Sequence, residues 1–527
     1  MIQTFLRIAL LLVCSCNNSS IEKTKKQSVR LNIHSEPPTL DPRKATDSTS
    51  VSVIKMCFDG LVRQGRDGKI VPALASEIEI SPEGDVYTFH LRDALWSDGT
   101  PVTAQDFEES WKGALDPRFP SERAYDLYPL KNAQRAKEGA LPLSEIGVKS
   151  IDKKTLQVKL EYPTSHFLKI LISHSFLPTP RHVQAKAPTW ADSDKHYVST
   201  GPFKLKKWSH YNEIVLEKNP LYWDAEVVKL EEVYLAIIEN ENTELALFDK
   251  GDLDWAGSPL SQLPLDPLPS LLHNKGAHEY PFSGVYYYVF NTKEFPFHNT
   301  NLRRAFALAL DRQSIIDNIT QGNQLPAMSL IPPTMWKRNV SHFRDGAVEE
   351  ARVLFEQALL ELGLTKETFP EITLSYNTVA SHHKIAQAVQ QQWKEALGVR
   401  VRLENKEWKV FLNELVHHQF QIARLGGVAS VNDPADFLEN YRYDASNRNY
   451  PQWSHEKFSA LLAKAERCKA DEKRMDYLAE AEKILIEEMP VIPLYFYTGH
   501  YLKKPYIKEV YISETNEIDL KHAYIDQ

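Results

Sequence analysis

The most distinctive part of the sequence reads Trp96-Ser97-Asp98-Gly99-Thr100-Pro101-Val102-Thr103-Ala104-Gln105-Asp106-Phe107, followed by Ser110-Trp111. Just before it, Tyr87, Phe89 and Leu91 lie two positions apart, and Val158 and Leu160 repeat that spacing further on. A period of two is typical of half-buried strands. We therefore expect strands on both sides of this stretch.

Helical spacing of apolar residues is found mainly in the second half of the chain. One predicted helix covers 349–362 and ends before Gly363, and another covers 381–397 and ends before Gly398; glycine is a common residue at helix C-termini. Longer helical patterns cover 457–469 and 470–489, with Cys468 predicted as a small buried core residue. Strands mixed with helices in this way indicate an α/β or α+β protein.

Length and composition limit the classes of protein that this chain can belong to. A chain of 527 residues exceeds what one hydrophobic core usually organises, so we expect two or three domains. Hydrophobic residues at 43% and charged residues at 25% are ordinary values for a globular protein. The net charge of −8 argues against nucleic-acid binding, for which a basic face is the usual footprint.

The N-terminus has the pattern of a secretion signal. Arg7 precedes a short apolar run, Ile8 to Val13, which is too short to span a bilayer of about 30 Å. The segment Val13-Cys14-Ser15-Cys16 resembles a bacterial lipobox, in which the signal is cut before a cysteine that carries lipid. We therefore expect residues 1–15 to be removed, Cys16 to be lipidated, and 16–28 to form a polar tether. The alternative is a plain secretory signal that contains cysteines.

Patterns of catalytic residues are absent from the sequence. It contains no GxSxG, HExxH or P-loop motif and no GxGxxG after a strand, so we expect neither an enzyme nor a cofactor. The pairs His382-His383 and His417-His418 lack a third metal ligand at a suitable spacing, and adjacent helical residues point in different directions.

Two aromatic clusters, Tyr286-Tyr287-Tyr288 and Tyr495-Phe496-Tyr497, have the character of short strands. Aromatic side chains with a few polar groups are typical of ligand pockets, although such clusters also occur in protein cores. The sequence therefore favours a binding protein.

Several motifs occur in the order found in one known family. They are Glu36-Pro37-Pro38-Thr39-Leu40-Asp41-Pro42, Phe58-Asp59-Gly60-Leu61-Val62, Tyr87-Thr88-Phe89-His90-Leu91-Arg92, the stretch 96–107, Thr200-Gly201-Pro202-Phe203, Asn219-Pro220-Leu221-Tyr222-Trp223 and Arg304-Ala305-Phe306-Ala307-Leu308-Ala309-Leu310-Asp311-Arg312. Together they resemble the oligopeptide-binding proteins of ABC importers, in the oligopeptide, dipeptide and nickel group of family 5 solute-binding proteins. The resemblance covers the whole mature chain.

This resemblance implies an α/β, two-lobed periplasmic-binding-protein fold of the class II type with an extra domain. Lobe I would comprise 29–58, 195–283 and 498–527, the accessory domain 59–194, and lobe II 284–497. The implied function is to capture short peptides between the lobes and to deliver them to ABC transporter permease subunits in the cytoplasmic membrane. The protein would act in the periplasm as a monomer, attached to a membrane by a lipid on Cys16.

The resemblance also implies ligand-binding residues. Arg424 matches an arginine near the ligand carboxylate, and His382 matches a histidine that assists it. Trp408 matches a tryptophan of the pocket wall, and Gly426 matches a glycine that lets the ligand backbone approach. Tyr287 and Tyr497 match aromatic residues of the cleft.

Three positions depart from the family pattern. Ser430 stands where the family has the aspartate that binds the peptide α-amine. Thr46, with Asp47 beside it, replaces a glutamate, and Leu415 replaces a basic residue of the carboxylate end. Either Asp47 or Asp433 reaches the amine from nearby, or the ligand places no amine there.

Other ligands and roles are compatible with the same sequence. The ligand could be a modified or cell-wall-derived (murein) peptide, a dipeptide, a nickel complex or haem. A non-transport role as a surface adhesin or chaperone is the alternative of a different class.

Overall fold

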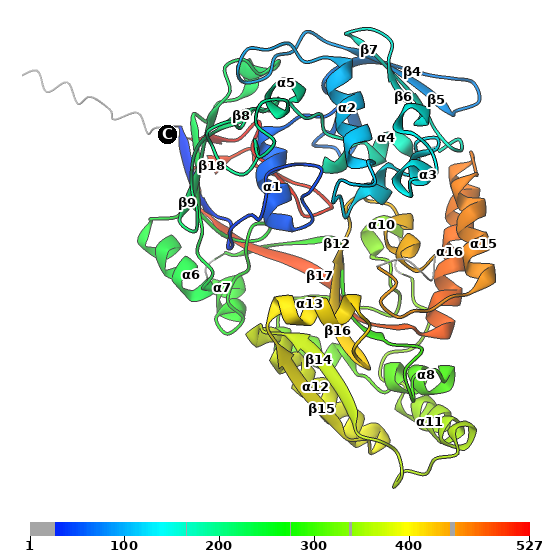
Figure 1. The fold of residues 1–527 in the computed structure, drawn as a ribbon. Helices are drawn as coiled ribbons and strands as arrows, with labels where there is room; N and C mark the ends of the chain where they lie inside the picture. Colours follow the sequence, from blue (N-terminus) through cyan, green and yellow to red (C-terminus); the bar gives the residue numbers. More distant parts are fainter. Residues whose placement is uncertain (1–26, 165, 275, 337–339, 443–447, 527) are drawn as a thin grey trace, which may run out of the picture.

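The computed structural model describes residues 27–526 except 165, 275, 337–339 and 443–447. The signal segment, Cys16 and most of the tether lie outside the described residues. Three larger sheets with surrounding helices organise the described chain, so the prediction of a mixed α/β fold is confirmed (Figure 1). In the described part of the chain, no helix has both the length and the apolar character needed to cross a membrane.

The first two sheets share one core. The lobe I sheet has the order β1 (Ser28–Asn32), β10 (Glu232–Ala236), β9 (Glu213–Lys218) and β8 (Phe203–Ser209). The accessory sheet has the order β4 (Ala75–Ile80), β5 (Val86–Leu91), β7 (Thr155–Lys159) and β6 (Val148–Ser150), which confirms the strands expected on both sides of the 96–107 stretch. Buried apolar residues of both regions form a continuous cluster, so the accessory domain packs directly on lobe I.

The distinctive 96–107 stretch forms a turn and the start of a helix. Gly99 adopts a positive φ of 89°, and the Asp98 side chain accepts a hydrogen bond from the Thr100 backbone N–H at 3.0 Å. Helix α2 (Ala104–Ala114) begins with a capping box formed by Thr103 and Asp106. Phe107 and Trp111 on this helix are fully buried, so the local turn fixes a large part of the accessory core.

Lobe II is built on the largest sheet. Its order is β11 (Trp255–Gly257), β17 (Val491–Lys503), β12 (His278–Phe290), β16 (Ile422–Val428), β14 (Ile372–Asn377) and β15 (Val401–Lys406), and β13 (Leu325–Pro326) also pairs with β17. Helices α8 (Thr300–Leu308), α11 (Val348–Leu362), α12 (Ala380–Leu397), α13 (Trp408–Val416), α15 (Glu456–Glu466) and α16 (Asp471–Glu488) surround it. The four helices predicted from apolar spacing are therefore present. The prediction for Cys468 is wrong: it lies just beyond α15 and is partly exposed, because the helix ends two residues earlier.

Strands β12 and β17 connect the lobes. Each is 13 residues long, and the predicted lobe boundaries at 283/284 and 497/498 fall inside them. They pair antiparallel from His278↔Tyr501 to Val289↔Val491, with an irregularity between Pro281 and Val285. The chain thus passes between the lobes twice within one strand pair (Figure 1). The boundaries themselves stay a prediction.

An ion-pair cluster joins the start of the accessory domain to the C-terminal segment of lobe I. Arg63 donates to Asp59 at 2.9 Å and to Asp519 at 2.6 Å, and the Asp59 side chain is only 3% exposed. Removing one partner of a buried ion pair commonly costs about 3–5 kcal/mol because it leaves an uncompensated charge. We predict that Arg63→Ala lowers the free energy of unfolding by about that amount, measured by denaturant titration with circular dichroism.

The matched control is Arg118→Ala, which removes an arginine whose side chain is 90% exposed and which pairs with Asp116. Surface ion pairs contribute little, so this change should leave stability unaltered. Equal stability of the two variants would contradict a structural role for Arg63.

Candidate functional site

The candidate site lies on the central strands of the largest sheet. In the β12–β16 ladder, Tyr288 faces Arg424 and Tyr286 faces Gly426, and in the β12–β17 ladder Tyr286 faces Tyr495. Alternate residues of a strand share a face, so these side chains meet on one side of the sheet. The rings of Tyr286 and Tyr495 stack with centroids 4.9 Å apart.

Arg424 is held by aromatic and amide groups. Its guanidinium carbon lies 4.6 Å from the centroid of Tyr286, Nη2 donates to the Tyr497 hydroxyl at 3.1 Å, and Nη1 donates to Asn377 Oδ1 at 3.4 Å. Burial acts to lower the pKa of Arg424, but the hydroxyls of Tyr497 and Tyr286 outweigh it and the pKa is raised. The arginine is therefore cationic.

No carboxylate among the described residues pairs with Arg424, and its buried Nε has no hydrogen-bond partner there. An enclosed guanidinium without an anion is costly, and carboxylates match its geometry. The geometry is therefore suited to a carboxylate, and the predicted role of Arg424 near the ligand carboxylate stays a prediction.

His382 packs beside Arg424 as a neutral group. Its Nδ1 lies 3.4 Å from the Tyr286 hydroxyl and its ring centroid is 5.6 Å from that of Tyr286. Burial, aided by the charge of Arg424, lowers the pKa of His382 to about 2. It can therefore take part in hydrogen bonding here but not as a second cation.

Gly426 makes room for Tyr497. A Cβ atom at Gly426 would lie 2.2 Å from the Tyr497 hydroxyl, far inside van der Waals contact. The Tyr497 ring is in turn stacked on Phe282, with centroids 5.6 Å apart. The glycine is thus needed for the contact between Tyr497 and Arg424, a role that differs from the predicted approach of a ligand backbone.

Two predicted residues lie apart from this cluster. Tyr287 points to the opposite face of the sheet, where burial raises its pKa to about 12 and Tyr441 is its hydrogen-bond partner. Trp408 is the first residue of α13 and is 50% exposed, with its ring packed against Phe411. A surface tryptophan of this kind is compatible with a pocket wall.

Ser430 belongs to a second polar cluster. Its hydroxyl accepts a hydrogen bond from Arg123 Nη2 at 2.7 Å, and its backbone N–H donates to Asp436 Oδ2 at 2.9 Å. Arg123 also donates to both carboxylate oxygens of Asp126, at 2.9 and 3.2 Å. The accessory domain and lobe II therefore meet at Ser430.

The carboxylates expected to compensate for Ser430 have other partners. Asp47 caps helix α1 (Ser48–Cys57) by accepting from the Ser50 backbone N–H at 2.8 Å, and Thr46 beside it is exposed. Asp433 accepts from both terminal nitrogens of Arg474 at 2.8 Å, and this pairing holds its pKa far below the usual range although burial acts to raise it. The carboxylates of Asp47 and Asp433 therefore both have hydrogen-bond partners within the protein.

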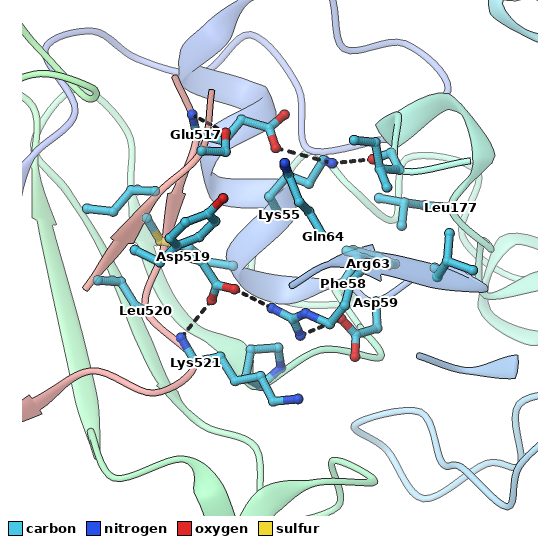
Figure 2. A pocket seen from close by; sticks show the side chains of 18 of the residues that line it. Lys55, Phe58, Asp59, Arg63, Gln64, Leu177, Glu517, Asp519, Leu520 and Lys521 are labelled. Atoms are coloured by element: carbon cyan, nitrogen blue, oxygen red, sulfur yellow. Dashed lines mark hydrogen bonds and ion pairs between the residues drawn. The ribbon is translucent and has the colours of Figure 1, made fainter. Parts of the chain in front are cut away.

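A pocket with about 730 Å³ of empty space, partly open to solvent, lies elsewhere, where lobe I meets the accessory domain (Figure 2). We call it the lobe I pocket. Arg63, Asp59 and Asp519 line it and are joined by the ion pairs described above. Lys521 pairs with Asp224 at 2.7 Å, and Lys55 pairs with Glu517 at 3.4 Å. The charges around this pocket are thus satisfied by the protein itself, and none of the predicted ligand-binding residues lines it.

The sequence interpretation missed several residues of both clusters. They are Tyr286, Tyr495 and Asn377 around Arg424, and Arg123 and Asp436 around Ser430. The aromatic runs were a usable signal for the two tyrosines. In the described part of the chain, no three His, Cys, Asp or Glu side chains are grouped as a metal site would require.

The chain belongs to family 5 of the bacterial extracellular solute-binding proteins: residues 69–449 match the family described as "Bacterial extracellular solute-binding proteins, family 5 Middle". It is 43% identical over 505 residues to the oligopeptide-binding protein OppA of Bacillus subtilis, covering 95% of this chain and 93% of that protein. The predicted family is thereby confirmed, and membership in a family of binding proteins agrees with the expectation of a binding protein.

Solved structures show the same fold. Haemophilus influenzae OppA in complex with RPPGFSPFR gives a TM-score of 0.83 at 29% identity, covering 95% of this chain and 99% of that one. The Escherichia coli murein tripeptide-binding protein MppA gives a TM-score of 0.86 at 30% identity, also covering 95% of this chain and 99% of that one. The unliganded open form of MppA gives a TM-score of 0.73 at 29% identity, covering 95% of this chain and 98% of that one.

The contact between Gly426 and Tyr497 yields a double-mutant test. Gly426→Ala should lower the free energy of unfolding by about 1–3 kcal/mol, the usual cost of overpacking. In the Tyr497→Phe background the cost should be smaller, because the clashing oxygen is gone and the ring carbon Cζ would lie 3.3 Å from the added methyl group. Thermal and denaturant unfolding of the four proteins measures this coupling. Equal costs in both backgrounds would show that Gly426 is not required by Tyr497.

Proposed function

We propose that this protein captures short peptides between its two lobes outside the cytoplasmic membrane and delivers them to an ABC importer. The observation that carries the proposal is Arg424, an enclosed guanidinium with no carboxylate partner among the described residues. The names of the relatives, oligopeptide-binding and murein tripeptide-binding proteins, support a peptide as the ligand.

The edge of β16 supports an extended ligand. Strand β14 pairs with β16 only at Ile422 and Ala423, whereas β12 pairs with β16 along its whole length. From Arg424 to Val428 the second edge of β16 is therefore not paired with any described strand. A peptide lying along this edge satisfies its main-chain groups by adding a strand, whatever its side chains are.

Enclosure of the ligand between the lobes also strengthens its polar contacts with the protein. Closure removes water from the space around Arg424, and electrostatic interactions are stronger at the lower effective dielectric constant. The irregularity between Pro281 and Val285, where the pairing of β12 and β17 shifts, is a suitable place for the lobes to bend. In this proposal the closed, peptide-loaded monomer is the form that meets the permease subunits.

The role of Arg424 is tested by substitution. Arg424→Ala should weaken peptide binding by about 2–5 kcal/mol, because the ligand carboxylate would be enclosed without its partner. The measurement is isothermal titration calorimetry with a panel of tri-, tetra- and pentapeptides.

The matched control is Arg402→Ala on strand β15 of the same sheet, whose side chain is 60% exposed and pairs with Glu404. It should bind the panel as the wild-type protein does. Unchanged affinity of Arg424→Ala across the panel would mean that Arg424 stabilises the sheet and has no role in the ligand site.

The proposal includes a lipid anchor on Cys16. The mature protein should begin at Cys16 and partition into detergent with the membrane, because an acyl chain gains about 0.8 kcal/mol for each buried methylene group. Cys16→Ala should give an uncleaved or freely soluble product. Mass spectrometry of the mature N-terminus and detergent phase partitioning are the measurements, and wild-type protein released with cleavage elsewhere would remove the anchor.

A further inference from the structure

Lobe II and the accessory domain meet through polar side chains, and the hydrogen bond from Arg123 to Ser430 is one of these contacts. Among the described residues, the buried apolar side chains of lobe II form one cluster, and those of lobe I and the accessory domain form another. Helices α15 and α16 of lobe II lie below the accessory helices α3 (Ala133–Lys137) and α4 (Phe167–Ile170) in Figure 1. Polar interfaces of this kind are typical of domains that move relative to each other.

Two arginines of lobe II reach across this interface to one short segment of the accessory domain. Arg474 Nη2 lies 3.2 Å from Nε2 of His166, the N-cap residue of α4. Arg467 Nη2 donates to the Tyr162 hydroxyl at 3.3 Å, and its guanidinium carbon lies 4.5 Å from the centroid of the Tyr162 ring. Arg474 is buried and oriented by its two hydrogen bonds to Asp433, so it is held in place on the lobe II side.

The contact between Arg474 and His166 depends on the protonation of the imidazole. A guanidinium group has only N–H donors, so His166 Nε2 accepts the hydrogen bond and the proton of the neutral ring lies on Nδ1. This Nδ1 is buried and has no hydrogen-bond partner in the described part of the chain. A second proton, on Nε2, would replace the hydrogen bond with a contact between two cations.

The charged groups around His166 lie on three elements: Arg474 and Asp471 on α16, Asp433 in the loop after β16, and Lys169 on α4. Burial lowers the pKa of His166 to about 4, Arg474 and Lys169 act in the same direction, and Asp433 and Asp471 oppose them. An exposed histidine has a pKa of about 6.5, so the ring takes up a proton more readily when the two domains are apart. The contact therefore stabilises the joined arrangement fully above about pH 6.5 and loses this contribution as the pH falls toward 4.

We propose that the accessory domain is a latch for lobe II, formed by the contacts of Arg474 with His166 and of Arg467 with Tyr162, and that protonation of His166 releases it. This assignment rests on the proposed function, because it takes closure of the lobes around a peptide as the movement that brings these residues together. Strands β12 and β17 join lobe II to lobe I, whereas the latch joins lobe II to the accessory domain. The affinity for peptide then depends on residues outside the cluster around Arg424, and a fall in pH favours release.

The release by protonation is tested with His166→Gln, because glutamine offers Arg474 an acceptor oxygen and does not titrate. Titration calorimetry with the tightest-binding member of the peptide panel compares the two proteins from pH 8 to pH 5. Between pH 6 and 5 the affinity of the wild-type protein should fall about five- to tenfold more than that of the variant. Asp436, whose pKa burial raises to about 6, titrates in the same range in both proteins and so cancels in the comparison. Superimposable pH curves would overturn the role of His166.

A second measurement uses the wild-type protein alone. Deuterium exchange at the imidazole C2 carbon, followed by mass spectrometry, gives the pKa of individual histidines. His166 should titrate at about pH 6.5 without peptide and at about pH 4 with peptide in excess, because only the joined arrangement buries its ring. The same pKa in both states would overturn the assignment even if His166→Gln failed to fold.

The latch itself is tested with Arg467→Ala, which should weaken peptide binding about two- to fivefold at every pH, the scale of an exposed cation–π contact. The matched control is Lys457→Ala on the same helix, α15, whose side chain pairs with Glu480 inside lobe II and should leave the affinity unchanged. Equal affinities of Arg467→Ala and the wild-type protein would overturn the latch, and the peptide-binding function would stand. Failure of the wild-type protein to bind any peptide of the panel would contradict the proposed function itself.

Discussion

The antiparallel pairing of β12 with β17 is the constraint on which the rest of the structure depends. These two long strands carry the chain from lobe I to lobe II and back, and they also carry Tyr286, Tyr495 and Tyr497. Their register places these rings around Arg424 of β16. The strand pair that joins the lobes is therefore the same strand pair that forms the candidate site around Arg424.

In the proposed function, Arg424 is a charge that the protein holds ready for the ligand. Aromatic faces, a tyrosine hydroxyl and an asparagine amide orient the guanidinium without neutralising it. A carboxylate from the protein in this position would compensate the charge and remove the driving force for ligand binding. The lobe I pocket illustrates the opposite case, because Arg63 there is fully matched by Asp59 and Asp519.

Local patterns predicted much of the fold. Apolar spacing gave the helices at 349–362 and 381–397, and alternation gave the strands around 96–107. The family resemblance supplied Arg424 and Tyr497 as candidate residues, but not the hydrogen bond between them. It could not supply Asp436, because the position of that carboxylate depends on how the chain returns to Ser430 after β16. It also could not supply Arg123, which reaches Ser430 from 307 residues away through the packing of the accessory domain. Contacts between domains of this kind leave no periodic signal in the sequence.

A crystal structure of the protein with a bound tetrapeptide tests the central claim most directly. The account predicts an extended peptide paired with the open edge of β16, with its carboxylate within hydrogen-bonding distance of Arg424. A peptide bound in the lobe I pocket, or one lying between the lobes with its carboxylate remote from Arg424, would contradict the account.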